Sequence, residues 1–133
     1  MKRVAVLALL VAGISGALAS VGSATHSWNG YHWARTANPF TLTVVDTNTA
    51  DWKDNLSRAL TAWDSSTVLN LRTVQAAADR RCKPAAGKVK SCNAAYGFNG
   101  WLGLAQVWVN GSHITQGTAK MNDSYLASSS YTE

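Results

Sequence analysis

The residues that could carry acid–base or metal chemistry are few and scattered along the chain. The 133 residues include three histidines, His26, His32 and His113. No two of them form an H-x-x-x-H pair, the spacing that places two zinc ligands on one face of a helix. Glu133 is the only glutamate, so a hydrolase with paired carboxylates would need two aspartates, and no two of these share an obvious loop. The residues alone predict no complete active site.

Motifs for nucleophilic and phosphate chemistry are also missing. The sequence contains no G-x-S-x-G elbow and no Gly-rich loop after a strand. An enzyme that uses His113 with a serine or an aspartate stays open as an alternative.

The two cysteines, Cys82 and Cys92, predict one disulfide, because an exported chain keeps an even cysteine pair oxidised. Their spacing, with no histidine or second cysteine pair nearby, does not fit a zinc site. Basic residues flank them: Arg80, Arg81, Lys83, Lys88 and Lys90. No nucleic-acid motif accompanies this cluster, so a solvated basic loop is favoured over an anion site, and we expect no nucleic-acid partner.

Residues 1–19 have the pattern of a secretory signal peptide. Lys2 and Arg3 precede a mostly apolar run at residues 4–18, and Ala17-Leu18-Ala19 is a small-x-small cleavage site. The run is short for a membrane span of about 20 residues. We therefore expect a secreted chain of residues 20–133, cleaved after Ala19 or alternatively after Ala24, with no membrane association after cleavage. Loss of the two basic residues lowers the formal net charge from +5 to +3, and we expect one small monomeric domain.

The elements that would position a site follow from periodicity. Alternation predicts strands at residues 40–46, 68–74 and 89–92, and a hairpin of residues 102–109 and 113–121 around Asn110-Gly111. An apolar stripe predicts one long amphipathic helix over residues 50–64, with Asn48 and Asp51 as its capping box and both tryptophans in the core. Its members are Trp52, Leu56, Ala59, Leu60 and Trp63. The predicted fold class is α+β, a twisted mixed sheet with one helix on a face.

Aromatic residues are concentrated before the first long strand. Trp28, Tyr31 and Trp33 are favoured as rings that pack on the domain. The alternative is a small secreted binding module that stacks carbohydrate on these three rings, or a secreted inhibitor.

Three segments together resemble a known family. GWLGLAQVWVNGSHITQGTAKMNDSYL (residues 100–126), SWNGYHWART (residues 27–36) and the Cys82–Cys92 loop resemble the N-terminal part of exported bacterial zinc metalloproteases of the matrixin-like, metzincin type. The resemblance covers essentially all of residues 20–133. It implies the upper half of a catalytic domain, in which strand 102–109 is an antiparallel edge strand.

The resemblance also implies roles. A polypeptide substrate would lie extended along the edge strand, bound by backbone hydrogen bonds. The candidate substrate-binding residues are Leu104, Ala105, Gln106, Val107 and Trp108. In the family, zinc is held by three histidines of H-E-x-x-H-x-x-G-x-x-H, whose glutamate is the general base.

The zinc motif is absent from these 133 residues. We expect a chain truncated before the zinc-binding helix, inactive alone, with no catalytic residue and no zinc held by itself. Gln106 and Lys120 occupy the neighbourhood where matrixins place structural-metal histidines. Asn122 and Asp123 could offer oxygens to calcium, but two ligands are far fewer than calcium takes.

Overall fold

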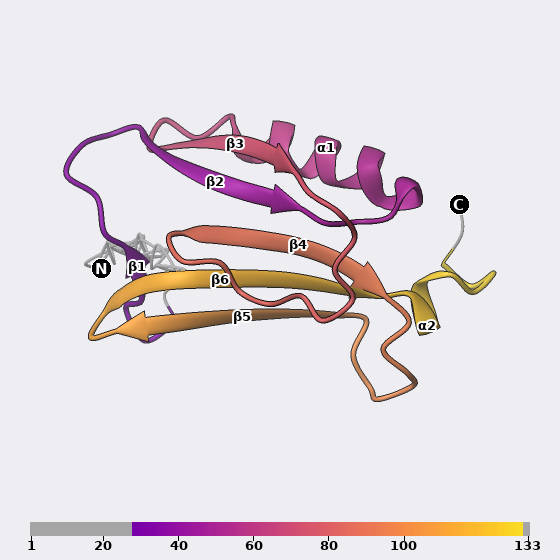
Figure 1. Cartoon of the computed structure of the whole chain (residues 1–133). Helices are drawn as coiled ribbons and strands as arrows, with labels where there is room; N and C mark the ends of the chain where they lie inside the picture. The colour runs from indigo at the N-terminus through magenta and orange to yellow at the C-terminus, as the bar shows by residue number, and fades with distance from the viewer. Residues whose placement is uncertain (1–27, 132–133) are drawn as a thin grey trace, which may run out of the picture.

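The computed structural model describes residues 28–131, which form a mixed sheet with a helix against part of one face (Figure 1). The predicted signal peptide, residues 1–19, lies outside the described residues. The strands are β1 (His32–Trp33), β2 (Phe40–Asp46), β3 (Leu69–Gln75), β4 (Lys88–Ala94), β5 (Gly103–Asn110) and β6 (His113–Asn122). The helical elements are the 3-10 turn η1 (Ala50–Trp52), α1 (Lys53–Trp63) and α2 (Asp123–Leu126).

The sheet is parallel except at one edge. Strand β2 lies between β3 and β4, β4 continues to β6, and all these pairs are parallel. The short β1 also pairs with β6 in parallel, and β5 pairs with β6 in antiparallel register. The predicted mixed sheet is therefore confirmed. Because β2, β4 and β6 run the same way, their carboxyl ends meet at one end of the sheet (Figure 1).

The prediction of one long amphipathic helix over residues 50–64 is wrong. A 3-10 turn precedes an α-helix of 11 residues. Thr49 provides no side-chain cap; its backbone N–H instead donates to Asn93 Oδ1 at 2.7 Å. The side chain of Asn48, expected in a capping box, donates to Asp46 and Ser91. These contacts with strand ends hold the segment in a tight turn and delay the start of the α-helix.

The expected tryptophan core of the helix is also wrong. Trp63 is 64% exposed, and Trp52 is half-buried. The buried apolar residues of the described part are Leu42, Val44 and the cysteines Cys82 and Cys92, which form the predicted disulfide. More side chains are buried in the polar class: Asp46, Thr47, Asn48, Ser91, Asn93, Thr118 and Asn122. The interior is therefore dominated by hydrogen bonds near the carboxyl ends of the strands.

The hairpin forms where it was predicted, with the turn displaced by one residue. Asn110 pairs with His113, so Gly111 and Ser112 are the central residues. Gly111 has φ of +59°, which favours glycine at the first central position. The register shifts by one residue, as in a bulge, between Trp108 and Val109, just before the turn. No helix in residues 28–131 is long and apolar enough to cross a bilayer.

Candidate functional site

The candidate substrate-binding residues all lie in β5, at the edge of the sheet. Within residues 28–131, β5 pairs only with β6, so its other side carries no strand. The register places Leu104 opposite Lys120 and Ala105 opposite Ala119. Figure 1 shows β5 as the outermost long strand, on the side of the sheet away from α1. Its free side is open to another extended chain.

The ladder identifies which backbone groups of β5 face outward. The backbone N–H of Asn122 donates to the carbonyl of Leu102 at 2.8 Å. In antiparallel pairs the bonded positions alternate, so Leu104 and Gln106 bond to β6. The N–H and C=O groups of Gly103, Ala105 and Val107 therefore lie on the free edge. Of the five predicted residues, only Ala105 and Val107 present both backbone groups to an incoming strand.

The side chains of β5 alternate between two faces. Leu104, Gln106 and Trp108 lie on one face, and the large apolar members of this set are more than a third exposed. Ala105 and Val107 therefore lie on the other face, which they share with their partners Ala119 and Gly117 in β6. That second face is the one that carries α1, since Ser91 pairs with Ala119 and hydrogen-bonds Asn48 just before the helix.

The helix covers only part of its face. Helix α1 packs on β3, above the β2–β3 side of the sheet (Figure 1). On the same face, beyond α1, lie five apolar side chains, which we call the uncovered face: Val89, Ala105, Val107, Ala119 and Met121. Ala105 is exposed and the other four are half-buried. The free edge of β5 therefore borders an apolar surface.

A loop anchored by Asn122 leads into β5. The side chain of Asn122 is fully buried. Its Oδ1 accepts from the N–H of Tyr96 at 3.0 Å and of Ser124 at 3.2 Å. Its Nδ2 donates to the carbonyls of Gly97 at 2.8 Å and Trp101 at 3.1 Å. One amide thus fixes both ends of the turn that sets the start of the edge strand.

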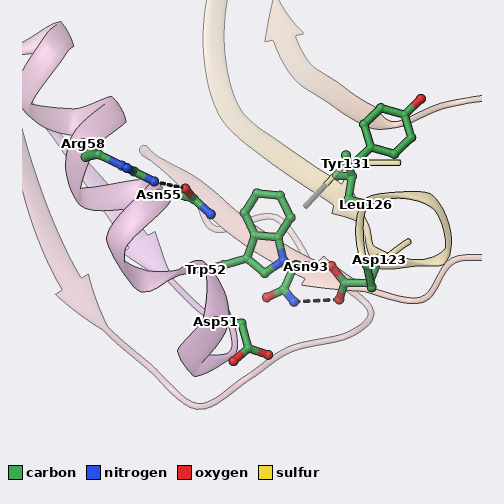
Figure 2. A pocket seen from close by; sticks show the side chains of 9 residues that line it. Asp51, Trp52, Asn55, Arg58, Asn93, Asp123, Leu126 and Tyr131 are labelled. Carbon is green, nitrogen blue, oxygen red and sulfur yellow. Dashed lines mark hydrogen bonds between the residues drawn. The ribbon is translucent and has the colours of Figure 1, made fainter. Parts of the chain in front are cut away.

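A pocket lies at the carboxyl ends of β4 and β6, between α1 and α2 (Figure 2). Asp123 is its central acceptor: Trp52 Nε1 donates to Oδ1 at 2.8 Å and Asn93 Nδ2 donates to Oδ2 at 2.7 Å. Arg58 Nη2 donates to Asn55 Oδ1 on the helix wall at 2.6 Å. Both oxygens of Asp123 are thus used to join η1 and β4 to the start of α2. These two oxygens and Oδ1 of Asn122 already accept hydrogen bonds. Calcium binding by Asn122 and Asp123 therefore stays a prediction that this geometry does not support further.

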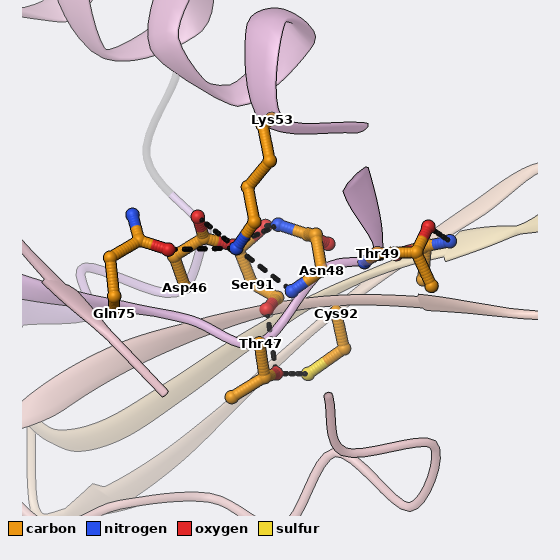
Figure 3. A network of polar contacts seen from close by, with 9 residues as sticks. Asp46, Thr47, Asn48, Thr49, Lys53, Gln75, Ser91 and Cys92 are labelled. Carbon is orange, nitrogen blue, oxygen red and sulfur yellow. Dashed lines mark hydrogen bonds and ion pairs between the residues drawn. The ribbon is translucent and has the colours of Figure 1, made fainter. Parts of the chain in front are cut away.

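A second polar network lies beneath the start of α1 (Figure 3). Lys53 Nζ is 2.7 Å from Asp46 Oδ2 and donates to Gln75 Oε1 at 2.7 Å. Burial alone would raise the pKa of Asp46, but the hydrogen bonds from Lys53 and Asn48 outweigh it and hold this pKa below its ordinary value. On the far side, Thr47 Oγ1 donates to the Ser91 carbonyl at 2.9 Å. This network joins the helix to β2 and β4 and is structural.

The basic cluster is only partly solvated. Lys90 Nζ is 2.9 Å from Asp79 Oδ2, and this hydrogen bond holds the pKa of Asp79 below its ordinary value. Arg80 donates to the carbonyl of Ala95 at 3.1 Å. Two of the five basic side chains therefore stabilise the disulfide loop.

The aromatic arm does not form a flat platform. The rings of Trp28 and Tyr31 are 5.9 Å apart at 78°, and Trp33 is half-buried. A Cβ placed on Gly117 would lie 3.6 Å from Trp33 Cζ2 and 3.3 Å from Val89. Trp33 therefore packs on the sheet beside the uncovered face, and the coplanar stacking surface of a sugar-binding module is not formed by Trp28 and Tyr31.

Two histidines that the sequence left apart come together. His32 in β1 pairs with His113 in β6, and their ring centroids are 4.9 Å apart. No pattern in the sequence links two positions so distant in the chain. Within residues 28–131, no three side chains of His, Cys, Asp or Glu come close enough to share a metal ion. The side chains present therefore do not fit the three-histidine zinc site that the resemblance implies.

Comparisons with protein-family models, with curated proteins and with solved structures found no match to this chain.

Proposed function

We propose that this chain forms the upper, substrate-aligning part of an exported zinc endopeptidase of the matrixin-like, metzincin type. The observation that carries the proposal is the free antiparallel edge of β5 in an otherwise parallel sheet. An extended polypeptide would pair with this edge through the backbone groups of Gly103, Ala105 and Val107. Strand addition of this kind holds a peptide in the extended form that hydrolysis of one bond requires.

The strand order supports the proposal. The resemblance implies an early helix after the first long strand, parallel strands, and an antiparallel strand at the edge beside the last one. The described part has this order, with α1 after β2 and with β5 outside β6.

The uncovered face is the second support. A sheet is stable when both faces that carry apolar residues are packed against another layer, and here α1 packs over the β2–β3 side of one face. A zinc-binding helix, which the resemblance implies after the hairpin, would find apolar side chains at Val89, Ala119 and Met121. Such a helix would bring its histidines beside the edge strand.

Peptide binding at the β5 edge tests the proposal. Labelled extended peptides would be titrated into the purified chain and followed by fluorescence anisotropy. Ala105→Pro removes one outward N–H and is tolerated where that N–H faces solvent, so it should weaken binding several-fold without lowering the melting temperature. Ala105→Val keeps the N–H and is the matched control. Equal binding by both variants would show that the edge does not hold the peptide.

A further inference from the structure

The pair of His32 and His113 lies at the opposite end of the sheet from the carboxyl-end pocket. Both residues are exposed. They are direct partners across the parallel β1–β6 ladder, so their side chains leave the sheet on the same face. The two rings meet edge to face at 85°. Neither residue has a part in the proposed alignment of substrate along β5.

The backbone holds the two residues in place. The N–H of His32 donates to the carbonyl of Ser112 at 3.1 Å, inside the hairpin turn. On the other side, the N–H of Tyr31 donates to the carbonyl of Trp28 at 3.0 Å, which closes a turn through Asn29 and Gly30, both with positive φ. Two tight turns therefore fix the histidines on neighbouring strands before any ligand binds.

Each of the two rings has a nitrogen that is available to coordinate a metal ion. His32 Nδ1 lies 2.8 Å from the carbonyl oxygen of Gly30. A carbonyl oxygen only accepts, so Nδ1 carries the proton and the lone pair of the neutral ring is on Nε2. Metal-binding histidines characteristically donate their second ring N–H to such a carbonyl, which fixes the tautomer and the ring orientation. Within residues 28–131, the ring of His113 makes no hydrogen bond.

We propose that His32 and His113 form a two-histidine site for a divalent transition-metal ion such as Zn²⁺, Ni²⁺ or Cu²⁺. Neutral imidazole nitrogens are the donors that these ions prefer. The remaining coordination positions face the hollow that the pair shares with residues 34–37 and 39–41 and are filled by water or an anion. Arg35 lines the same hollow, and its guanidinium, over the ring of Phe40, favours an anionic ligand there.

Metal titration of the full chain tests the site. Isothermal titration with Zn²⁺ and Ni²⁺, in a buffer that does not coordinate metals, should show one ion per chain. Mutating a residue that only supports a metal-bound histidine lowers metal affinity roughly tenfold or more. Removal of a ligand itself should lower it at least as much, so His32→Ala and His113→Ala should each weaken metal binding by that factor or more. His26→Ala, the matched control, should leave the affinity unchanged. Mg²⁺, which prefers oxygen ligands, should not bind there.

Three results would overturn the site. These are equal affinity of the wild type and His113→Ala, an equal loss in His26→Ala, and no saturable binding of either ion. If an alanine variant does not fold, the wild type alone still tests the site. In its NMR spectrum, substoichiometric Ni²⁺ should selectively broaden the ring proton signals of two histidines. Uniform broadening of all three histidines, or of none, would contradict the pair.

Discussion

Asn122 is the side chain whose loss should be most damaging to the edge strand. It is fully buried at the end of β6, and it bonds the turn that precedes β5. Asn122→Ala removes every one of these side-chain contacts, although the carbonyl of Gly97 still accepts from the N–H of Asn99 at 3.1 Å. We expect the free energy of unfolding to fall by about 2–4 kcal/mol.

The magnitude follows from the contacts. Four backbone groups bond to the Asn122 amide at 2.8–3.2 Å: the N–H groups of Tyr96 and Ser124 and the carbonyls of Gly97 and Trp101. Each net hydrogen bond contributes about 1 kcal/mol, and a buried group left unpaired costs more. Gly97 is exposed and the other three residues are half-buried. Because water can replace some of the lost bonds, the total loss of unfolding free energy stays at about 2–4 kcal/mol.

Urea unfolding followed by tryptophan fluorescence measures the effect. Asn99→Ala is the control, since Asn99 is exposed and its contacts are longer, at 3.2 and 3.3 Å; its loss should be within about 0.5 kcal/mol. Asn122→Asp keeps the acceptor for Tyr96 and Ser124 but sets a carboxylate against two carbonyls, so it should also destabilise strongly. If Asn122→Ala is no worse than Asn99→Ala, the anchoring role of Asn122 is refuted.

Three further predictions concern the rest of the sheet. The pKa of Asp46 is lowered in the folded state. Its contribution to the free energy of unfolding is therefore present above the unfolded pKa of about 3.9 and is lost as pH falls through the folded value. In a plot of urea midpoint against pH, Asp46→Asn should reduce the decline on the acid side, and an unchanged decline would contradict this. Joint replacement of Cys82 and Cys92 by serine opens a loop with a sequence separation of 10 and should lower the unfolding free energy by about 3 kcal/mol; a loss below 1 kcal/mol would contradict it. A hydrophobic dye should bind the uncovered face, and Ala119→Arg should reduce its fluorescence while the far-UV circular dichroism stays native; unchanged fluorescence would place the dye elsewhere.

The hairpin and the strands could be predicted because their information is local. Alternation along β2 and a glycine-containing turn at Gly111 are readable without any tertiary contact. The predicted helix included residues 50–52, which form the 3-10 turn η1. Its apolar stripe also placed Trp63 in the core, because a stripe does not show which side chains have a partner. Trp63 matches the stripe, yet no layer of the described part covers it. The start of α1 depends on Asp46 at the end of β2 and on Asn93, which comes from β4, far along the chain.

The polar interior and the histidine pair could not be predicted from spacing. The amides of Asn93 and Asn122 become buried acceptors and donors only when β4 and β6 align in parallel. One rule could have pointed to them, since polar residues at the carboxyl ends of parallel strands meet at one edge of a sheet. For His32 and His113 no local rule exists, because their contact arises from the pairing of a two-residue strand with β6.

The composition of β5 connects its free edge with the uncovered face. Proteins protect edge strands against unwanted pairing with charged residues, prolines, short length or bulges. The eight residues of β5, GLAQVWVN, contain no charge and no proline, and the bulge lies only at the far end, after Trp108. The outward backbone of Ala105 and Val107 is thus left unprotected where their side chains border the uncovered face. A strand kept open beside an apolar surface is suited to receive an extended chain, which is why β5 is the element that we propose for substrate binding.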